Sequence, residues 1–479
     1  MDKKQMLLEI EEGLNVVNKG ILSNEEFPDD KLEELKEYHS YITKQKQISP
    51  KEQTMIIDEI GKLKNKGGYI MVVEEKLTKY AELLVDVGVS INEGKRLFVS
   101  ASTDALPLVR EVTRVAYDRG ASEVVVKLTD DKLTRLHAEN RTAEELATIH
   151  PWIVEERMHY SDEHAGFLSI ISSSPELLKG IDPMKLREMQ IASGKAMKDF
   201  SARVQSDFHS WCVAGYPSVD WAKLVYPDET EEVAFEKLLD LILYTVRADQ
   251  ENPVEAWETH DKTLHEKVDI LNDANLKSLR FVSEGIDLTI GLPKDYLFAG
   301  ASSIDSTGRK FMANMPTEEV FTAPDRNNVN GYVSNTLPLS HGGNIIDNFK
   351  LTFENGKVVD FEVEVGYEIL ENILETDEGS RYLGEVALVP YDSPISNTST
   401  LFYNTLFDEN ASCHIALGSG YAFNVKDGKE KSREELSEIG INDSITHVDF
   451  MIGNSDTDII GITEDGKEIQ IFKDGDWSI

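Results

Sequence analysis

Residues 96–127 decide the fold class of this chain, and their sequence is RLFVSASTDALPLVREVTRVAYDRGASEVVVK. The apolar run from Arg96 to Ala101 is typical of a buried strand, and the small polar residues after it are favourable helix caps. A helix is expected to run to about Arg119, where Gly120 ends it, and Glu123 begins the next strand. A strand, a helix and a second strand in this order predict a βαβ unit in a parallel sheet.

The same alternation continues along the chain. Residues 167–171 are strand-like, a turn at 172–175 precedes a further expected helix, and residues 210–214 are strand-like again. Ligands often bind at the carboxyl ends of such strands. No G-x-G-x-x-G sequence follows the first strand, however, which argues against a dinucleotide site.

Beyond about residue 255 the pattern changes to hairpins. Residues 279–292 suggest paired strands, and tight turns are expected at Asn355-Gly356, Asp465-Gly466 and Asp474-Gly475. These signals predict antiparallel pairing, so the C-terminal part should be rich in β-structure.

The first seventy residues are expected to be helical. Apolar side chains recur at helical spacing in three places, and Ser49-Pro50-Lys51-Glu52 is typical of a helix start. The three apolar stripes are Leu7, Ile10, Leu14 and Val17; Leu32, Leu35, Tyr38 and Ile42; and Met55, Ile56, Ile60 and Leu63. Residues 64–68, with two glycines, are expected to form a linker.

A chain of 479 residues exceeds what one hydrophobic core usually serves. We therefore predict an α/β plus α+β protein in three parts. These are a small all-helical extension over residues 1–70, a parallel-sheet α/β domain over 71–255, and a β-rich metal-binding domain over 256–479.

Charge and composition exclude several classes of protein. The formal net charge of −38, from 87 acidic and 49 basic residues, would repel nucleic acids and anionic membranes. The N-terminus lacks the apolar core of a secretory signal, and no run of roughly 18 apolar residues could span a bilayer. We expect a cytoplasmic protein. Its two cysteines, Cys212 and Cys413, are too few for a disulfide framework and are expected to be small buried residues.

The most informative stretch for function is Thr446-His447-Val448-Asp449-Phe450-Met451-Ile452-Gly453. In a β-strand, His447 and Asp449 would share one face while the apolar residues share the other. This arrangement places an imidazole and a carboxylate together on a rigid element, as a metal site requires.

Three upstream segments also place Glu or His among apolar residues. They are residues 314–322, residues 381–387 and residues 408–418, the last followed by Gly420 and Tyr421. Carboxylate and imidazole ligands suit Zn²⁺, Mn²⁺ or Co²⁺, and Mg²⁺ less tightly. A shared set of such ligands can hold two ions roughly 3.5–4 Å apart.

These four segments, in this order, resemble the aminopeptidase T and aminopeptidase S family of metallopeptidases, and the likeness runs from about Met71 to the C-terminus. The resemblance implies a homodimer with enclosed active sites, two divalent metal ions per subunit and a catalytic tyrosine at Tyr421. It implies that the metal ligands are Glu319, Glu385, Glu409, His414, His447 and Asp449, with Glu385 also counted among the catalytic groups. Residues 1–70 resemble a small bacterial domain of unknown function.

The activity expected is hydrolysis of the N-terminal peptide bond of peptides by a two-metal-activated water. One carboxylate must carry a proton to the leaving amine, and the sequence leaves open which one; Glu318 is a candidate because it neighbours Glu319. Two alternatives stay open. One is another two-metal hydrolase such as a phosphoesterase, and the other is a non-catalytic, metal-stabilised peptide-binding protein.

Three further side chains are weighed for a place near the site. His341, between a serine and two glycines, is either a substrate-pocket residue or an exposed loop residue. Arg326 and Arg381 either steady the carboxylate cluster or form surface ion pairs. His260 and His265 are not expected to share a helical face, and we interpret them as ordinary side chains.

Overall fold

A computed structural model describes residues 5–7, 9–10, 32–44, 56 and 66–479 of the chain. The chain divides into two compact units, Met1–Leu77 and Thr78–Ile479. Helix α4 (Lys66–Leu83) contains this division and continues into a π-helical turn, Leu84–Gly88.

The first unit contains helix α2 (Leu32–Lys44). Leu35 and Ile42 of this helix are buried against residues of the predicted N-terminal stripe. The other buried members of this cluster are Met6, Leu7, Ile10 and Ile56. The helix start expected at Ser49 and the stripe positions Leu14 and Val17 lie outside the described residues.

The linker expected at residues 64–68 differs in part from the structure. Residues 66–68 lie in helix α4, whereas residues 64 and 65 lie outside the described part of the chain. Glycine costs about 1 kcal/mol in a helix relative to alanine, a penalty that neighbouring helical residues can outweigh.

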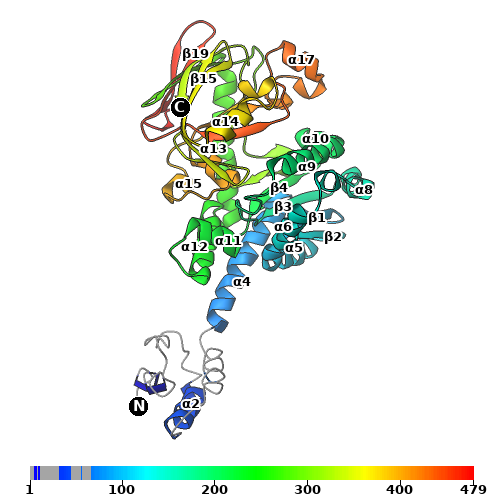
Figure 1. The fold of residues 1–479 in the computed structure, drawn as a ribbon, viewed down its shortest axis with the longest axis vertical. Helices are drawn as coiled ribbons and strands as arrows, with labels where there is room; N and C mark the ends of the chain where they lie inside the picture. The colour runs from blue at the N-terminus through cyan, green and yellow to red at the C-terminus, as the bar shows by residue number, and fades with distance from the viewer. Residues whose placement is uncertain (1–4, 8, 11–31, 45–55, 57–65) are drawn as a thin grey trace. The chain divides into compact units, whose positions relative to one another are not determined.

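The second unit contains the predicted parallel sheet, with strand order β10-β4-β3-β1-β2 (Figure 1). Its strands are β1 (Arg96–Ser102), β2 (Glu123–Thr129), β3 (Gly166–Ile171), β4 (Trp211–Gly215) and β10 (Asn314–Met315). The accompanying helices are α5 (Leu106–Asp118), α6 (Asp131–Asn140), α7 (Ala143–Leu146), α8 (Pro151–Asp162), α9 (Pro183–Ala196) and α10 (Lys198–Gln205). The predicted strand–helix–strand unit is confirmed, while the helix expected directly after Pro175 begins at Pro183.

Strand β10 joins this sheet from a distant part of the sequence. Asn314 pairs with Val213, and Met315 pairs with Ala214, both in parallel register. Because Glu319 follows four residues later, this pairing fixes the segment that carries it beside the edge of the parallel sheet.

Three helices connect the parallel sheet to the β-rich part. They are α11 (Val219–Val225), α12 (Glu231–Thr245) and α13 (Pro253–Asp273). Each begins with a side-chain cap: Ser218, Thr230 and Asn252 accept a hydrogen bond from a main-chain N–H of the first turn.

A nine-stranded antiparallel sheet follows, with the order β13-β14-β12-β6-β5-β19-β20-β21 and β15 paired to β14. Its strands are β5 (Leu276–Ser283), β6 (Ile286–Gly291), β12 (Val329–Ser334), β13 (Leu339–His341), β14 (Asn344–Glu354), β15 (Lys357–Val365), β19 (Asp458–Thr463), β20 (Glu468–Lys473) and β21 (Asp476–Trp477). The predicted hairpin over 279–292 and the turns at 355–356, 465–466 and 474–475 are confirmed.

A second antiparallel sheet has the order β18-β17-β16-β11-β7. Its strands are β7 (Ala299–Gly300), β11 (Val320–Thr322), β16 (Leu383–Leu388), β17 (His414–Gly418) and β18 (His447–Met451). One apolar core packs both antiparallel sheets together and includes Val386, Ile415 and Phe450. The remaining short elements are β8 (Ser303–Ile304), β9 (Lys310–Phe311), α14 (Tyr367–Leu374), α15 (Pro394–Asn397), α16 (Thr405–Asp408) and α17 (Arg433–Glu438).

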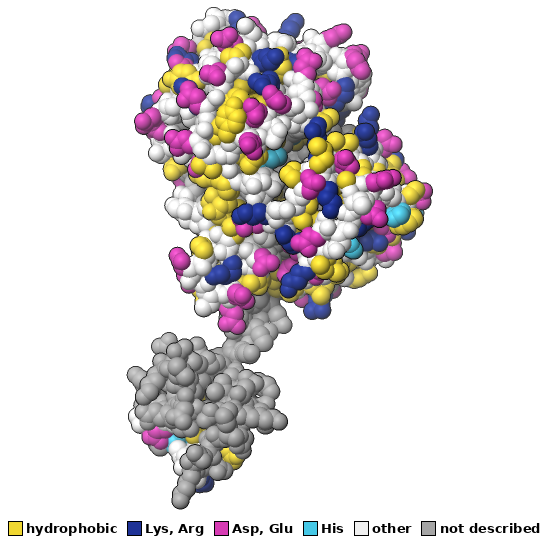
Figure 2. Space-filling model, in the orientation of Figure 1, with side chains coloured by type: hydrophobic (Ala, Val, Ile, Leu, Met, Phe, Trp, Pro, Cys, Tyr) yellow, Lys and Arg dark blue, Asp and Glu magenta, His cyan; other side chains and the backbone are white. Residues whose placement is uncertain are grey.

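The surface of the second unit carries charge of both signs. Figure 2 shows acidic and basic side chains interspersed across the face in view. Among the described residues, no helix is both long and apolar enough to cross a bilayer.

Candidate metal centre

Three adjacent strands of the five-stranded antiparallel sheet, β16, β17 and β18, carry four of the predicted ligands. Ala416 at the middle of β17 pairs with Glu385 of β16 on one side and with Asp449 of β18 on the other. Paired residues of neighbouring strands share a face of the sheet, and so do residues two apart on one strand. His414 and His447 therefore lie on the same face as the two carboxylates.

The opposite face of β18 is apolar, as the sequence predicts. Val448, Phe450 and Ile452 are all buried and belong to the core shared by the two antiparallel sheets. This burial anchors the strand and limits the freedom of His447 and Asp449.

Glu319 and Glu409 approach the cluster from outside these three strands. Glu319 directly precedes β11, and Glu409 begins a 3₁₀ turn (Glu409–Ala411) after α16. The carboxylate of Asp408 accepts hydrogen bonds of 2.8 Å from the main-chain nitrogens of Phe402 and Asn404, which fixes the loop before Glu409.

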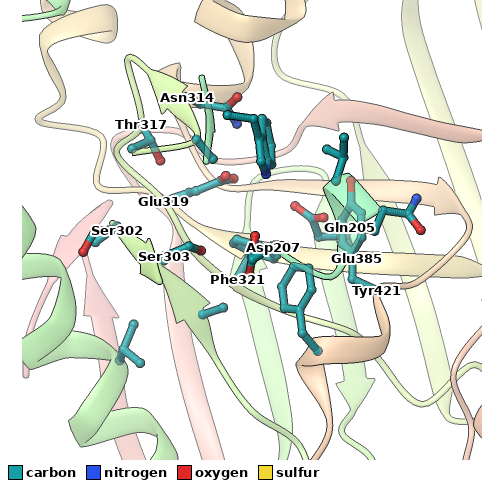
Figure 3. A pocket seen from close by; sticks show the side chains of 18 of the residues that line it. Gln205, Asp207, Ser302, Ser303, Asn314, Thr317, Glu319, Phe321, Glu385 and Tyr421 are labelled. Carbon is teal, nitrogen blue, oxygen red and sulfur yellow. The ribbon is translucent and has the colours of Figure 1, made fainter. Parts of the chain in front are cut away.

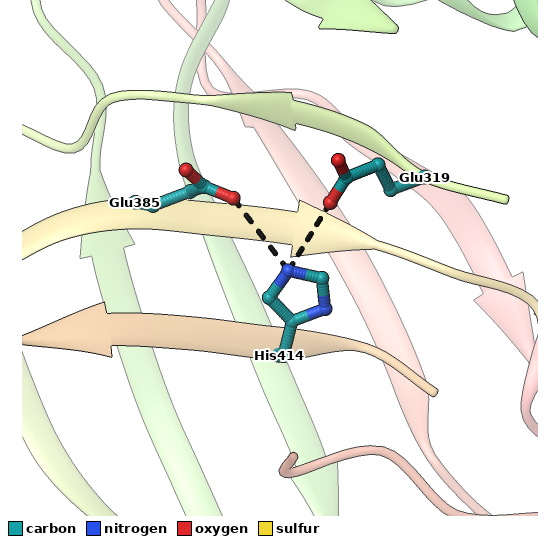
Figure 4. A group of neighbouring side chains, drawn as sticks. All are labelled: Glu319, Glu385 and His414. Atoms are coloured by element: carbon teal, nitrogen blue, oxygen red, sulfur yellow. Dashed lines mark ion pairs between the residues drawn. The ribbon is translucent and has the colours of Figure 1, made fainter. Parts of the chain in front are cut away.

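The imidazole of His414 lies between two carboxylates (Figure 4). Its Nε2 atom is 3.2 Å from Glu319 Oε2 and 3.5 Å from Glu385 Oε1. The other oxygen of Glu385 is 3.5 Å from His447 Nε2, which in turn lies 3.3 Å from Asp449 Oδ1. Glu385 is thus shared between two clusters of potential ligands.

Each cluster can hold a divalent ion. The ligand atoms of Glu319, Glu385 and His414 all lie within 4.8 Å of one another, and so do those of Glu385, His447 and Asp449. Glu319 Oε2 and Asp449 Oδ1 are buried and have no hydrogen-bond partner among the described residues. Buried carboxylate oxygens are costly without a partner, and a bound cation would supply one.

Main-chain carbonyls orient both imidazoles. His447 Nδ1 lies 2.8 Å from Ser419 O, and His414 Nδ1 lies 3.4 Å from Ser412 O. Donation from Nδ1 to a carbonyl leaves Nε2 free to bind a metal, which is the usual outer support of a histidine ligand. A Cβ at Gly384 would lie 2.3 Å from Ser419 O, so this position must be glycine for the carbonyl to lie where it holds His447.

The pKa values of the cluster reflect its crowded charges. Burial opposes ionisation of Glu385, but His414 and His447 beside it hold its pKa at about 2. Burial and the carboxylate of Glu319 raise the pKa of Glu409 well above its usual value. Burial opposes protonation of the two histidines, yet the neighbouring carboxylates raise the pKa of each well above its usual value. The carboxylates therefore demand positive charge, and divalent ions would provide it.

A cavity of about 700 Å³ opens onto the cluster. Glu319, Glu385 and Tyr421 point into it (Figure 3), and Glu409, His447 and Asp449 also line it. The ring of Tyr421 lies 5.2 Å from the imidazole of His447 and stacks on Phe423. Burial and the nearby carboxylates raise the pKa of Tyr421 well above its usual value, so its hydroxyl stays protonated and can donate a hydrogen bond.

The structure separates the other candidates from this cluster. The Glu318 carboxylate is paired with Arg247, and Glu318 is absent from the cavity lining. The guanidinium of Arg326 lies over the ring of Tyr382, and Arg381 lies near Glu375 and the carbonyl of Val358. His341 is exposed at a hairpin and is absent from the cavity lining. Cys212 and Cys413 are buried and free, as expected.

Sequence reasoning missed Arg247, and it gave His260 and Asn410 no role near the site. Arg247 is 71 residues from its partner Glu318, and no motif spacing links them. The only available signal was the neighbouring position of Glu318 and Glu319, which predicts side chains on opposite sides of an extended segment.

The fold and this cluster present a candidate metal site beside a cavity of about 700 Å³. Residues 73–477 match the family described as thermophilic metalloprotease (M29). The chain belongs to this family and is a metal-dependent peptidase. The family resemblance seen in the sequence is confirmed.

Several aminopeptidases are similar to this chain along almost their whole length. Aminopeptidase AmpS of Bacillus subtilis (strain 168) is 51% identical over 404 residues, which cover 84% of this chain and 98% of that protein. Aminopeptidase 2 of Geobacillus stearothermophilus is 43% identical, covering 85% of this chain and 98% of that protein. The solved structure of wild-type AmpT from Thermus thermophilus is 36% identical with a TM-score of 0.80, covering 84% of this chain and 99% of that chain.

The N-terminal segment matches a different family. Residues 2–65 match a family of unknown function, DUF1128. A UPF0435 protein of Staphylococcus carnosus is 40% identical over 63 residues, which cover 13% of this chain and 93% of that protein. The expected resemblance of this segment to a small bacterial domain is confirmed.

Proposed function

We propose that the chain is an aminopeptidase that removes single residues from the free N-terminus of peptides with two divalent ions bound. The observation that carries this proposal is the position of Glu385, which offers one oxygen to each of two clusters of potential ligands. A carboxylate shared in this way suits a bridge between two ions roughly 3.5–4 Å apart.

The proposed ligands are the six residues of the sequence prediction, namely Glu319, Glu385, Glu409, His414, His447 and Asp449. Zn²⁺, Co²⁺ and Mn²⁺ suit this set of oxygen and nitrogen donors, and Mg²⁺ suits it less well. When bound, such ions lower the pKa of water and polarise a carbonyl oxygen.

Side chains of the cavity would stabilise the negative charge and transfer the proton during cleavage. Tyr421 keeps its proton and would donate a hydrogen bond to the negative oxygen that develops on the scissile carbonyl. A carboxylate of the cluster would carry a proton to the leaving amine. The pairing of Glu318 with Arg247 counts against Glu318 in that role. The candidates that remain are the carboxylates of the cluster itself, Glu319, Glu385, Glu409 and Asp449.

The test compares a short leucyl peptide with its N-acetylated twin, using chelator-treated protein before and after addition of Co²⁺, Zn²⁺ or Mn²⁺. The proposal predicts release of leucine from the free-amine peptide alone, and only after a metal is restored. Cleavage of the acetylated peptide at the same rate would contradict the aminopeptidase assignment, and cleavage in chelator would contradict the metal requirement.

The cavity argues against the phosphoesterase alternative. Its described lining includes a single lysine, Lys429, and no arginine. Lys429 Nζ lies 3.0 Å from Asp207 Oδ2, so its charge is already paired. Apart from the two proposed ions, a phosphate in this cavity would meet no unpaired cationic side chain among the described lining residues. A purely peptide-binding role would leave the protonated Tyr421 beside the cluster without a use.

We further propose a cytoplasmic homodimer that binds neither nucleic acid nor membrane, with domains at residues 1–70, 71–255 and 256–479. The N-terminal extension carries none of the proposed ligands, so a chain beginning at Met71 should keep most of its peptidase activity. A truncated chain that folds but loses most of its activity would contradict this division. Measurement of molecular mass in solution tests the dimer.

A further inference from the structure

A buried ion pair includes Glu318, the residue directly before the proposed ligand Glu319. Arg247 Nη1 donates to Glu318 Oε1 at 2.6 Å, and Nη2 donates to Glu318 Oε2 at 2.9 Å. The Arg247 side chain is 13% exposed and that of Glu318 is 4% exposed. Two parallel bonds of this kind fix both the position and the plane of a carboxylate.

His260 of α13 extends this contact to the main chain. Its Nε2 atom lies 2.8 Å from the carbonyl oxygen of Thr317, and its Nδ1 atom lies 3.4 Å from Arg247 Nη2. Because a guanidinium can only donate, Nδ1 accepts and Nε2 carries the hydrogen that is donated to Thr317. Arg247 and His260 thus hold residues 317 and 318 from the side of the helices.

Asn410 connects the same segment to the second glutamate-bearing turn. The main-chain nitrogen of Glu318 donates to Asn410 Oδ1 at 2.7 Å. Asn410 is fully buried, its Nδ2 donates to Leu406 O at 3.1 Å, and its own carbonyl accepts from Ser393 Oγ at 2.9 Å. A rigid frame therefore joins the residue before Glu319 to the residue after Glu409.

Two neighbouring side chains of this segment point in different directions. Glu318 faces Arg247, while Glu319 lines the cavity beside His414. A rotation of the segment that moved Glu318 would also turn Glu319 away from the cluster. Arg247 itself is held at the end of α12 with a φ of 59°, and its guanidinium lies over the ring of the buried Trp257.

We propose that Arg247 is a positioning residue that sets the affinity of the site for divalent metal by fixing Glu319 and Glu409 through Glu318 and Asn410. This inference rests on the metal site of the proposed function. It does not depend on the peptide substrate, because Arg247 does not line the cavity.

The deciding variant is Arg247→Lys, which keeps the positive charge but cannot form the bidentate hydrogen bonds to Glu318. Co²⁺ affinity is measured on metal-stripped protein by competition with a chelating indicator, and the thermal midpoint is measured on the same samples. The proposal predicts that the Kd for Co²⁺ rises about 10- to 100-fold, the range typical when residues that hold the metal ligands in place are removed.

The matched control is Arg309→Lys. Arg309 makes a comparable buried pair with Asp305 at 2.9 Å, and neither residue lines the cavity. This control should lower the thermal midpoint in metal-free protein while leaving the Co²⁺ Kd within about twofold of the unmodified chain. An equal loss of affinity in both variants would reduce Arg247 to a general structural role and overturn the proposal.

A second variant covers the case in which Arg247→Lys does not fold. Glu318→Gln keeps the side-chain volume and the main-chain bond to Asn410 but loses the charge that faces Arg247. It should also raise the Co²⁺ Kd about tenfold or more. A folded Glu318→Gln protein with unchanged Co²⁺ affinity overturns the proposal.

Metal affinity and peptide cleavage are read separately in this design. An unmodified chain that binds Co²⁺ but leaves leucyl peptides intact would contradict the proposed function, while the variants would still decide the role of Arg247. An unmodified chain that does not bind Co²⁺ would overturn both.

Discussion

Asp449 of β18 lies directly opposite Ala416 of β17 in the antiparallel register. Glu385 of β16 faces the same alanine from the other side. The central strand thus contributes only a methyl group between two carboxylates, and this small residue leaves room for ions on that face of the sheet.

A larger side chain at position 416 should therefore block the centre. We predict that Ala416→Leu abolishes binding of at least one divalent ion and lowers peptidase activity by more than tenfold. The control Leu417→Phe adds bulk to the same strand on the opposite face, where overpacking typically costs 1–3 kcal/mol. Leu417→Phe should lower stability and retain the metal, as measured by elemental analysis after gel filtration. Full metal content in Ala416→Leu would contradict this view of the site.

The shared position of Glu385 predicts unequal effects of ligand variants. Glu385→Gln should weaken binding at both clusters, because each depends on one of its oxygens. Asp449→Asn should weaken only the cluster that contains His447. Native mass spectrometry across a metal titration distinguishes the two outcomes. Loss of a single ion in Glu385→Gln, with the second bound at normal affinity, would show that Glu385 does not bridge.

Removal of the Tyr421 hydroxyl should affect catalysis more than binding. We predict that Tyr421→Phe lowers kcat by about 10²–10³-fold, the range seen when one oxyanion donor is removed. KM and metal content should change little, because the hydroxyl is not a proposed ligand. Steady-state kinetics with a leucyl peptide measure this, and an unchanged kcat would remove Tyr421 from the mechanism.

A buried histidine far from the cluster in sequence makes stability depend on pH. His209 is fully buried, and its Nδ1 atom lies 3.0 Å from Ser161 Oγ. Burial and the nearby charge of Arg203 lower its pKa to about 4 from 6.5. Between these two values the unfolded chain binds the proton more readily than the folded chain, so stability falls as the pH falls.

This loss of stability is negligible above about pH 7.5 and should amount to about 2 kcal/mol at pH 5. His209→Asn keeps a polar atom near Ser161 and cannot titrate. The difference in unfolding free energy between pH 7.5 and pH 5, measured in urea with chelator present, should be smaller in the variant by about that amount. Equal differences in the two proteins would show that His209 is not the group responsible.

Local patterns predicted much of the fold. The apolar run at residues 96–101 and the turn at Asn355-Gly356 each depend on a few adjacent residues, and the structure has both as expected. The pairing of β10 with β4 could not be predicted in this way, because two residues at 314–315 join a strand about a hundred positions earlier. Helix α4 likewise extends through Gly67 and Gly68, where local propensity favours a linker.

Local pattern likewise predicted some features of the candidate site and not others. The shared face of His447 and Asp449 follows from strand periodicity alone, and the structure places both side chains on one face. Local pattern could not pair Glu318 with Arg247, since that contact depends on how α12 and α13 pack behind the sheet. It also gave no reason to separate Arg326 and Arg381 from the cluster, although neither contacts it in the structure.

The two-metal mechanism is tested most directly by counting bound metal ions against recovered activity. Stripped protein is titrated with Co²⁺, bound ions per chain are measured by native mass spectrometry, and leucyl-peptide cleavage is assayed on the same samples. Activity should reach its maximum only as the second ion binds. Full activity with one ion per chain, or with none, would contradict the two-metal mechanism.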